Sequence, residues 1–119
     1  MLKSTEGMSL ISNVADPIIK NNGEEQFYIY LSAAVQRILN APPGERMAYM
    51  QLAMPYMKND NVLRYPFIIR EDLLARLNSY LKEFNLNPVL LVTGALLVET
   101  GISQLPATLP RFEDFHRER

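Results

Sequence analysis

The segment NPVLLVTGALLVETG, residues 87–101, constrains the fold of this chain more than any other feature of the sequence. Asn87 is a good N-cap, Pro88 suits the first helical position and Gly101 suits a helix end, so the segment is predicted to be a helix. Its interior is apolar on every side, with Thr93 as the only polar residue near the middle. The helix is too short to cross a bilayer, which needs about 20 apolar residues. It must therefore be central in the fold or shared between two subunits.

A β-hairpin is the alternative for the same segment. Two short strands, residues 89–92 and 95–98, would then meet at a turn formed by Thr93 and Gly94. The β-branched residues favour this reading, but Thr-Gly is a weaker turn signal than Asn-Gly. We therefore favour the helix.

Composition indicates one soluble globular unit. The chain has 119 residues, of which 48% are apolar and 21% charged, and this is enough for one core but not for two. A net charge of -1 gives no overall attraction to nucleic acid or to anionic membranes. The absence of cysteine excludes disulfides, thiolate metal sites and cysteine nucleophiles. The N-terminal segment has no long apolar region typical of a secretory signal, so we expect an intracellular, cytoplasmic protein.

Three further segments show helical periodicity. Residues 24–40 place one apolar face at helical spacing, and residues 70–84 form the cleanest amphipathic pattern in the chain. Between them, a methionine-rich segment is predicted to begin near Pro43, which suits a first helical turn. This helix should kink or stop at Pro55, which lacks a backbone N–H.

The remaining segments are predicted to be less regular. A helical pattern at the N-terminus predicts one or two turns followed by a kink or break at Pro17; its members are Met8, Ile11, Val14 and Ile18. Residues 59–69 are interpreted as a linker, because Pro66 keeps the preceding residue extended. We thus predict an all-α, single-domain bundle of four to five helices. The helical domain spans residues 1–102, and an extended, proline-containing C-terminal strap spans residues 103–119.

Methionines at helical spacing form the first candidate interface. Met47, Met50 and Met54 share an arc of about 80 degrees with Met57, although Pro55 can displace Met57 from the stripe. The opposite side of the helix carries Tyr49, Leu52 and Tyr56. Methionine fills irregular cores and is also common on adaptable binding surfaces. We favour the core for this stripe and retain it as a candidate interface.

The C-terminal strap supplies the second candidate interface. Its prolines favour an extended conformation. Four apolar side chains are expected to dock in a groove of this protein or of a partner: Leu105, Leu109, Phe112 and Phe115.

No catalytic, metal-binding or cofactor-binding residues are predicted. The one histidine, His116, lies near a charged terminus, so a Ser-His-Asp type relay has no well-placed base. Adjacent carboxylates such as Glu24 and Glu25 do not share a helix face. No phosphate-binding glycine loop occurs. A carboxylate-only metal site stays open, but no ligand spacing supports one.

A local basic patch is the best candidate for nucleic-acid binding. Arg64, Arg70 and Arg76 occur with the aromatic residues Tyr65 and Phe67 between them. Neighbouring carboxylates favour a solvated face over a phosphate-binding track.

The function that we predict is therefore a non-enzymatic helical protein-interaction module, such as an adaptor, assembly factor or regulatory subunit. The expected partners are other proteins or a second copy of the chain, and no membrane. One alternative is a nucleic-acid-associated regulator that uses the arginine patch, and another is an enzyme subunit whose site is not visible in the sequence. An apolar central helix and two apolar faces on the methionine helix favour self-association.

Overall fold

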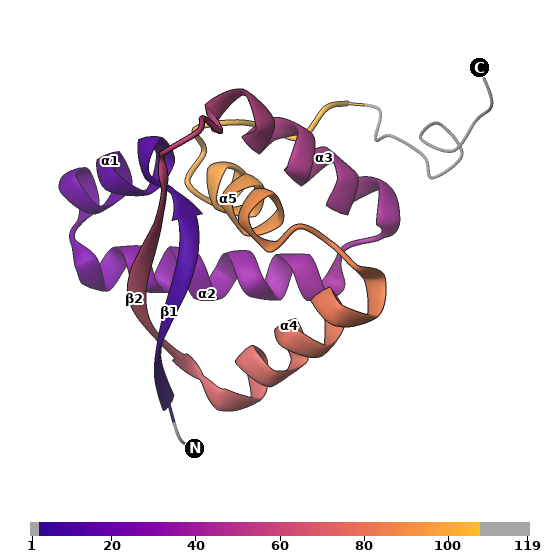
Figure 1. The fold of residues 1–119 in the computed structure, drawn as a ribbon, viewed down its shortest axis with the longest axis horizontal. Coiled ribbons are helices and arrows are strands. Elements are labelled where there is room, and N and C mark those ends of the chain that lie inside the picture. The colour runs from indigo at the N-terminus through magenta and orange to yellow at the C-terminus, as the bar shows by residue number, and fades with distance from the viewer. Residues whose placement is uncertain (1–2, 108–119) are drawn as a thin grey trace.

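A computed structural model describes residues 3–107, which form five α-helices, one short 3-10 helix and two strands (Figure 1). In chain order these are β1 (Lys3–Ile11), α1 (Ser12–Asn22), α2 (Glu24–Asn40), α3 (Pro43–Ala53), η1 (Met54–Tyr56), β2 (Val62–Arg70), α4 (Glu71–Phe84) and α5 (Pro88–Glu99). The chain is mostly helical with a small sheet. The all-α prediction is therefore correct for the helices and wrong for the two strands.

Helix α5 lies at the centre of the fold and packs against α2, α3 and β1 (Figure 1). Every residue from 91 to 97 is buried. The Asn87 side chain accepts hydrogen bonds from the backbone N–H groups of Val89, at 3.0 Å, and Leu90, at 3.3 Å. The helix ends before Gly101, which has a positive φ of 79°. The predicted helix and its central position are confirmed, and the hairpin alternative is wrong.

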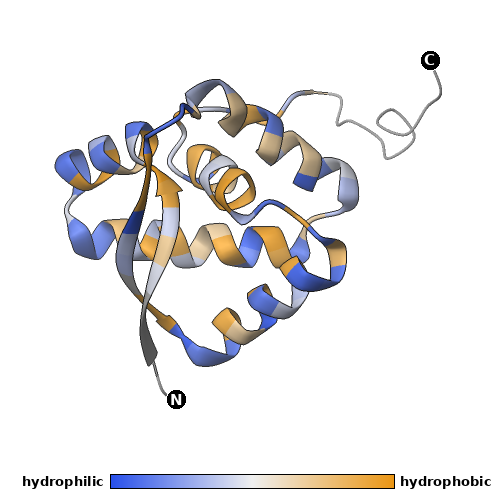
Figure 2. Cartoon of the chain, viewed as in Figure 1, coloured by the Kyte–Doolittle hydropathy of each residue, from blue (hydrophilic) through white to orange (hydrophobic). Residues whose placement is uncertain are grey.

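Hydropathy explains this central position. Figure 2 shows α5 as a largely apolar helix in the middle of the molecule, whereas the surrounding helices carry hydrophilic residues on their outer sides. A helix that is apolar on every side must be covered on every side. In the described part of the chain, no helix is long and apolar enough to cross a membrane.

The sheet joins two segments that are far apart in the sequence. β1 and β2 pair antiparallel, with a register that runs from Lys3 opposite Arg70 to Ile11 opposite Val62. In β2 the buried Tyr65 alternates with exposed neighbours, as expected for a half-buried strand. Within residues 3–107 the sheet consists of these two strands, so Pro66 removes no hydrogen bond that an inner strand would need.

Three sequence predictions are therefore wrong, each at least in part. Residues 59–69 are not a linker, because most of them belong to β2. Met8 and Ile11 are not helical, because they belong to β1. Of the kink or break predicted at Pro17, the break is absent, since α1 continues past this residue to Asn22.

The other helix boundaries agree with the sequence. α2 spans residues 24–40, as its periodicity predicted, and α4 spans residues 71–84, within the segment 70–84 for which a helix was predicted. Pro43 occupies the first turn of α3, and the α-helical geometry ends at Ala53, just before the 3-10 turn that contains Pro55. Proline therefore sets both ends of the methionine helix.

Candidate binding groove

The methionine stripe lies at the edge of the core. The core side of α3 is formed by smaller and aromatic residues, of which Tyr49 is completely buried. Met47 and Met50 are half-buried, and Met50 packs against the core cluster. Met54 is 59% exposed. Of these three methionines only Met50 therefore packs against the core, and Met54, just beyond α3, is exposed.

Met47 and Met50 line a cavity of about 460 Å³ between α3 and the turn that joins α4 to α5. We call this cavity the methionine groove. Its lining residues are Pro43, Arg46, Met47, Met50, Phe84, Asn85, Leu86 and Asn87. Apolar side chains with a few polar groups are typical of binding sites in proteins.

Arg46 is the unusual residue of the methionine groove. It is only 8% exposed, although arginine is rarely buried without a partner. Its guanidinium carbon lies 5.0 Å from the ring centre of Tyr80 and 4.7 Å from that of Phe84. Both rings belong to α4, four residues apart, with centres 5.0 Å from each other. Cation–π contacts with the two rings hold the guanidinium in place.

No carboxylate among the described residues neutralises Arg46. Among the described side chains, those of residues 7–66 and 68–107, the ion pairs are those of Arg37 with Glu99 and of Arg70 with Asp72. The buried Nε of Arg46 has no hydrogen-bond acceptor. Burying an arginine without an anion or an acceptor is costly. An anionic group entering the methionine groove would supply both.

Tyr80 adds a second unsatisfied polar group beside Arg46. Its hydroxyl is buried and has no hydrogen-bond partner. Burial raises the pKa of Tyr80, and the nearby positive charge of Arg46 opposes that shift. The hydroxyl therefore stays protonated at neutral pH and retains a hydrogen that it can donate.

The turn between α4 and α5 forms a well-defined wall of the groove. Asn85 adopts the left-handed conformation, with φ of 52°, which asparagine tolerates better than most residues. The N–H of Leu86 donates to the carbonyl of Leu81 at 3.2 Å, and the Asn87 side chain caps α5. These bonds fix the backbone that carries Phe84 and Leu86 into the groove.

The three arginines of the predicted nucleic-acid patch line three different cavities. Arg64 lies in a cavity with β1 and α5, Arg70 in one with α2, and Arg76 in one with the end of α2. Arg70 also pairs with Asp72, with 3.0 Å between Nε and Oδ1, and holds the pKa of Asp72 below its usual range. The three arginines therefore do not share a cavity.

Only one residue of the predicted strap interface can be placed. Leu105 is half-buried and packs against the core cluster. Leu109, Phe112 and Phe115 lie outside the described residues, as does His116.

Sequence reasoning missed the aromatic partners of Arg46. Tyr80 and Phe84 stand four residues apart, so their sharing of one helix face could be read from the sequence. Arg46 precedes Met47, but α3 and α4 are separated by β2, and nothing in the sequence placed them side by side.

Comparisons of the chain with protein-family models, with curated proteins and with solved structures found no significant match. Within the described part of the chain, no three histidine, aspartate or glutamate side chains gather at one point.

Proposed function

We propose that this protein is a non-enzymatic interaction module that binds a peptide segment of a partner protein in the methionine groove. The segment would carry a carboxylate beside an apolar side chain. The observation that supports this proposal is the uncompensated Arg46, which lies against two neighbouring aromatic rings in the wall of an otherwise mostly apolar groove.

The methionine groove is lined by a charged residue and by apolar residues, and each kind would contact a different part of the ligand. A carboxylate would accept charge-assisted hydrogen bonds from Arg46, which are stronger than neutral ones. An apolar side chain would pack against Met47, Met50 and Leu86. Methionine has several rotatable bonds, so this part of the groove can adapt to side chains of different shape.

Protein interfaces favour this combination of residues. Arginine and aromatic residues are enriched among the side chains that dominate binding energy. Phe84 is 47% exposed and Met54, one turn beyond Met50, is 59% exposed, so both offer apolar surface next to the groove. A peptide longer than the groove could extend over them.

The proposal is tested with two fluorescein-labelled peptides that differ only in charge. One contains Phe-Glu-Asp-Phe, the order found at residues 112–115 of this chain, and the other contains Phe-Gln-Asn-Phe. Fluorescence anisotropy with the full chain should show that the acidic peptide binds about tenfold or more tightly. Equal binding of the two peptides, or no binding of either, would contradict the proposal.

A second copy of the chain is a further partner that we propose. α5 is buried within one chain, so it is not available to be shared. Exposed apolar residues instead occur on either side of a cavity between α2 and β2, where Ile29 is 59% and Ile68 is 42% exposed. Sedimentation of the protein at tens of micromolar tests for self-association. A strictly monomeric protein would exclude a second copy of the chain as a partner.

A further inference from the structure

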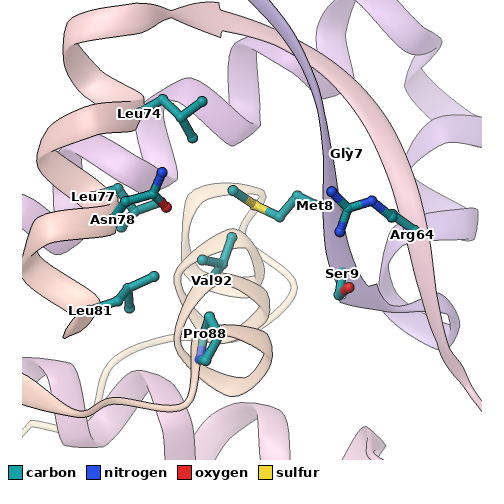
Figure 3. Close-up of a pocket in the computed structure, with 10 residues that line it drawn as sticks. All are labelled: Gly7, Met8, Ser9, Arg64, Leu74, Leu77, Asn78, Leu81, Pro88 and Val92. Carbon is teal, nitrogen blue, oxygen red and sulfur yellow. The ribbon is translucent and has the colours of Figure 1, made fainter.

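A second cavity, separate from the methionine groove, lies between the sheet, α4 and α5 (Figure 3). We call it the Arg64 pocket. Its volume is about 360 Å³, near the lower end of the range for small-molecule sites. Its lining residues are Gly7, Met8, Ser9, Arg64, Leu74, Leu77, Asn78, Leu81, Pro88 and Val92.

Gly7 determines where the Arg64 side chain lies. Arg64 pairs with Ser9 across the two strands, and its side chain extends over Gly7, the next residue of β1 on the same face. A Cβ atom at Gly7 would lie 2.4 Å from Nε of Arg64. Because Gly7 has no side chain, the guanidinium can lie against β1 at the edge of the pocket, as Figure 3 shows.

The inner wall of the pocket is apolar. Leu77 and Val92 are almost completely buried and form its inner surface. Met8 lies between them and Arg64 in Figure 3, and its flexible side chain can adjust to a ligand. Asn78 is placed on the α4 side, across from Arg64, and adds an amide that can donate or accept.

Arg64 is the one charged residue among the described residues that line the pocket. It takes part in neither of the ion pairs found among the side chains that the structure describes, which are those of residues 7–66 and 68–107. Its guanidinium can therefore offer two parallel N–H groups to a carboxylate. A phosphate dianion would leave one negative charge without a counter-charge, so a single arginine suits a monoanion better.

We propose that the Arg64 pocket binds a small monocarboxylate with an apolar body. The carboxylate pairs with Arg64 near Gly7 and Ser9, and the apolar body lies against Met8, Leu77 and Val92. This site differs from the methionine groove in its lining residues and in its ligand, so it stands independently of the peptide-binding function.

The test uses the full, isotopically labelled chain and three probes of matched length: hexanoate, hexanamide and hexyl phosphate. Amide resonances of Gly7, Ser9 and Asn78 should shift in a saturable way with hexanoate. Hexanamide, which lacks the charge, should bind about tenfold or more weakly. Hexyl phosphate should bind no more tightly than hexanoate.

Two variants test the positions of the groups. Arg64→Gln should lower hexanoate affinity about tenfold or more and leave hexanamide affinity unchanged. Gly7→Ala should also lower hexanoate affinity, because the new methyl group displaces the guanidinium while the charge stays. Arg76→Gln, at an exposed arginine outside the pocket, is the matched control and should change nothing.

Three results would overturn the inference. They are equal affinity for hexanoate and hexanamide, an Arg64→Gln protein that binds hexanoate as the parent does, and saturable shifts confined to residues outside the pocket. If a single-stranded oligonucleotide binds in a way that depends on Arg64 and hexanoate does not bind, the function of Arg64 is instead to bind nucleic acid.

Discussion

Gly94 of α5 lies directly against the backbone of Tyr49 in α3. A Cβ atom built on Gly94 would lie 1.8 Å from the Tyr49 carbonyl oxygen and 2.4 Å from its carbonyl carbon. Any side chain at position 94 would therefore push the two helices apart. The close approach places α3 against the central helix and so fixes one wall of the methionine groove.

We expect Gly94→Ala to destabilise the fold by about 3 kcal/mol or more, at the upper end of overpacking effects, because the clash is with backbone. Chemical denaturation measures the loss. Gly7→Ala is the control, since its clash is with the Arg64 side chain, which can move. If the two variants lose similar amounts of stability, the backbones of α3 and α5 do not approach each other as closely as described.

Met50 is expected to contribute both to stability and to binding. Because it is half-buried, Met50→Ala should cost about 1 kcal/mol, less than the roughly 2 to 5 kcal/mol of a fully buried site such as Leu91→Ala. Met50→Lys should weaken peptide binding in the methionine groove more than Met54→Lys does. A Met50→Ala loss as large as that of Leu91→Ala would instead place the stripe in the core.

Two buried tyrosines should make the fold sensitive to alkaline pH. Burial raises the pKa of Tyr49 and of Tyr65, and hydrogen bonds that their hydroxyls donate to Glu45 and to Asp16 raise it further. Tyrosine in an unfolded chain titrates near pH 10. The stabilisation is therefore complete below about pH 10 and is lost as pH rises above it, since only the unfolded chain releases these protons readily.

Ultraviolet titration combined with denaturation at several pH values measures this effect. We expect the loss of stability above about pH 10 to be smaller in Tyr65→Phe than in the parent. Tyr56→Phe, at a half-buried tyrosine, is the matched control. If the free energy of unfolding decreases with alkaline pH as steeply in Tyr65→Phe as in the parent, the role given to Tyr65 is contradicted.

The segment after α5 is expected to stabilise the fold through Leu105. The N–H of Ser103 donates to the carbonyl of Leu97 at 3.1 Å, and Leu105 packs against the core. Deleting residues 103–119 should therefore lower the melting temperature. Deleting only residues 108–119 keeps Leu105 and is the control. A full deletion that melts like the parent would show that this packing contributes nothing.

The helices could be predicted because their signals are local. The apolar face of residues 24–40, the proline at position 43 and the Asn87 cap each act within one or two turns. The two strands could not, because β1 and β2 are stabilised by each other across about fifty intervening residues. In β2 the sequence shows no alternation of apolar and polar residues, because apolar residues such as Leu63 and Ile68 occupy exposed positions.

The methionine stripe was visible in the sequence, but its position at the edge of the core was not. Spacings of three and four residues show which side chains share a face of a helix, but they do not show which face meets α5. The Gly94 contact decides this, because it turns Tyr49 inward and leaves Met47 and Met50 at the groove. Arg46 was missed since its aromatic partners come from a helix that is distant in the sequence.

The most direct test of the proposed function is the coupling between Arg46 and the carboxylates of the peptide. Acidic and amide peptides are titrated into the parent and into Arg46→Met, whose melting temperature should not fall, because an apolar side chain of similar length replaces a buried charge. We expect a coupling free energy of about 1.5 to 3 kcal/mol. A folded Arg46→Met protein that still prefers the acidic peptide as strongly as the parent does would contradict the assignment of the methionine groove as the binding site.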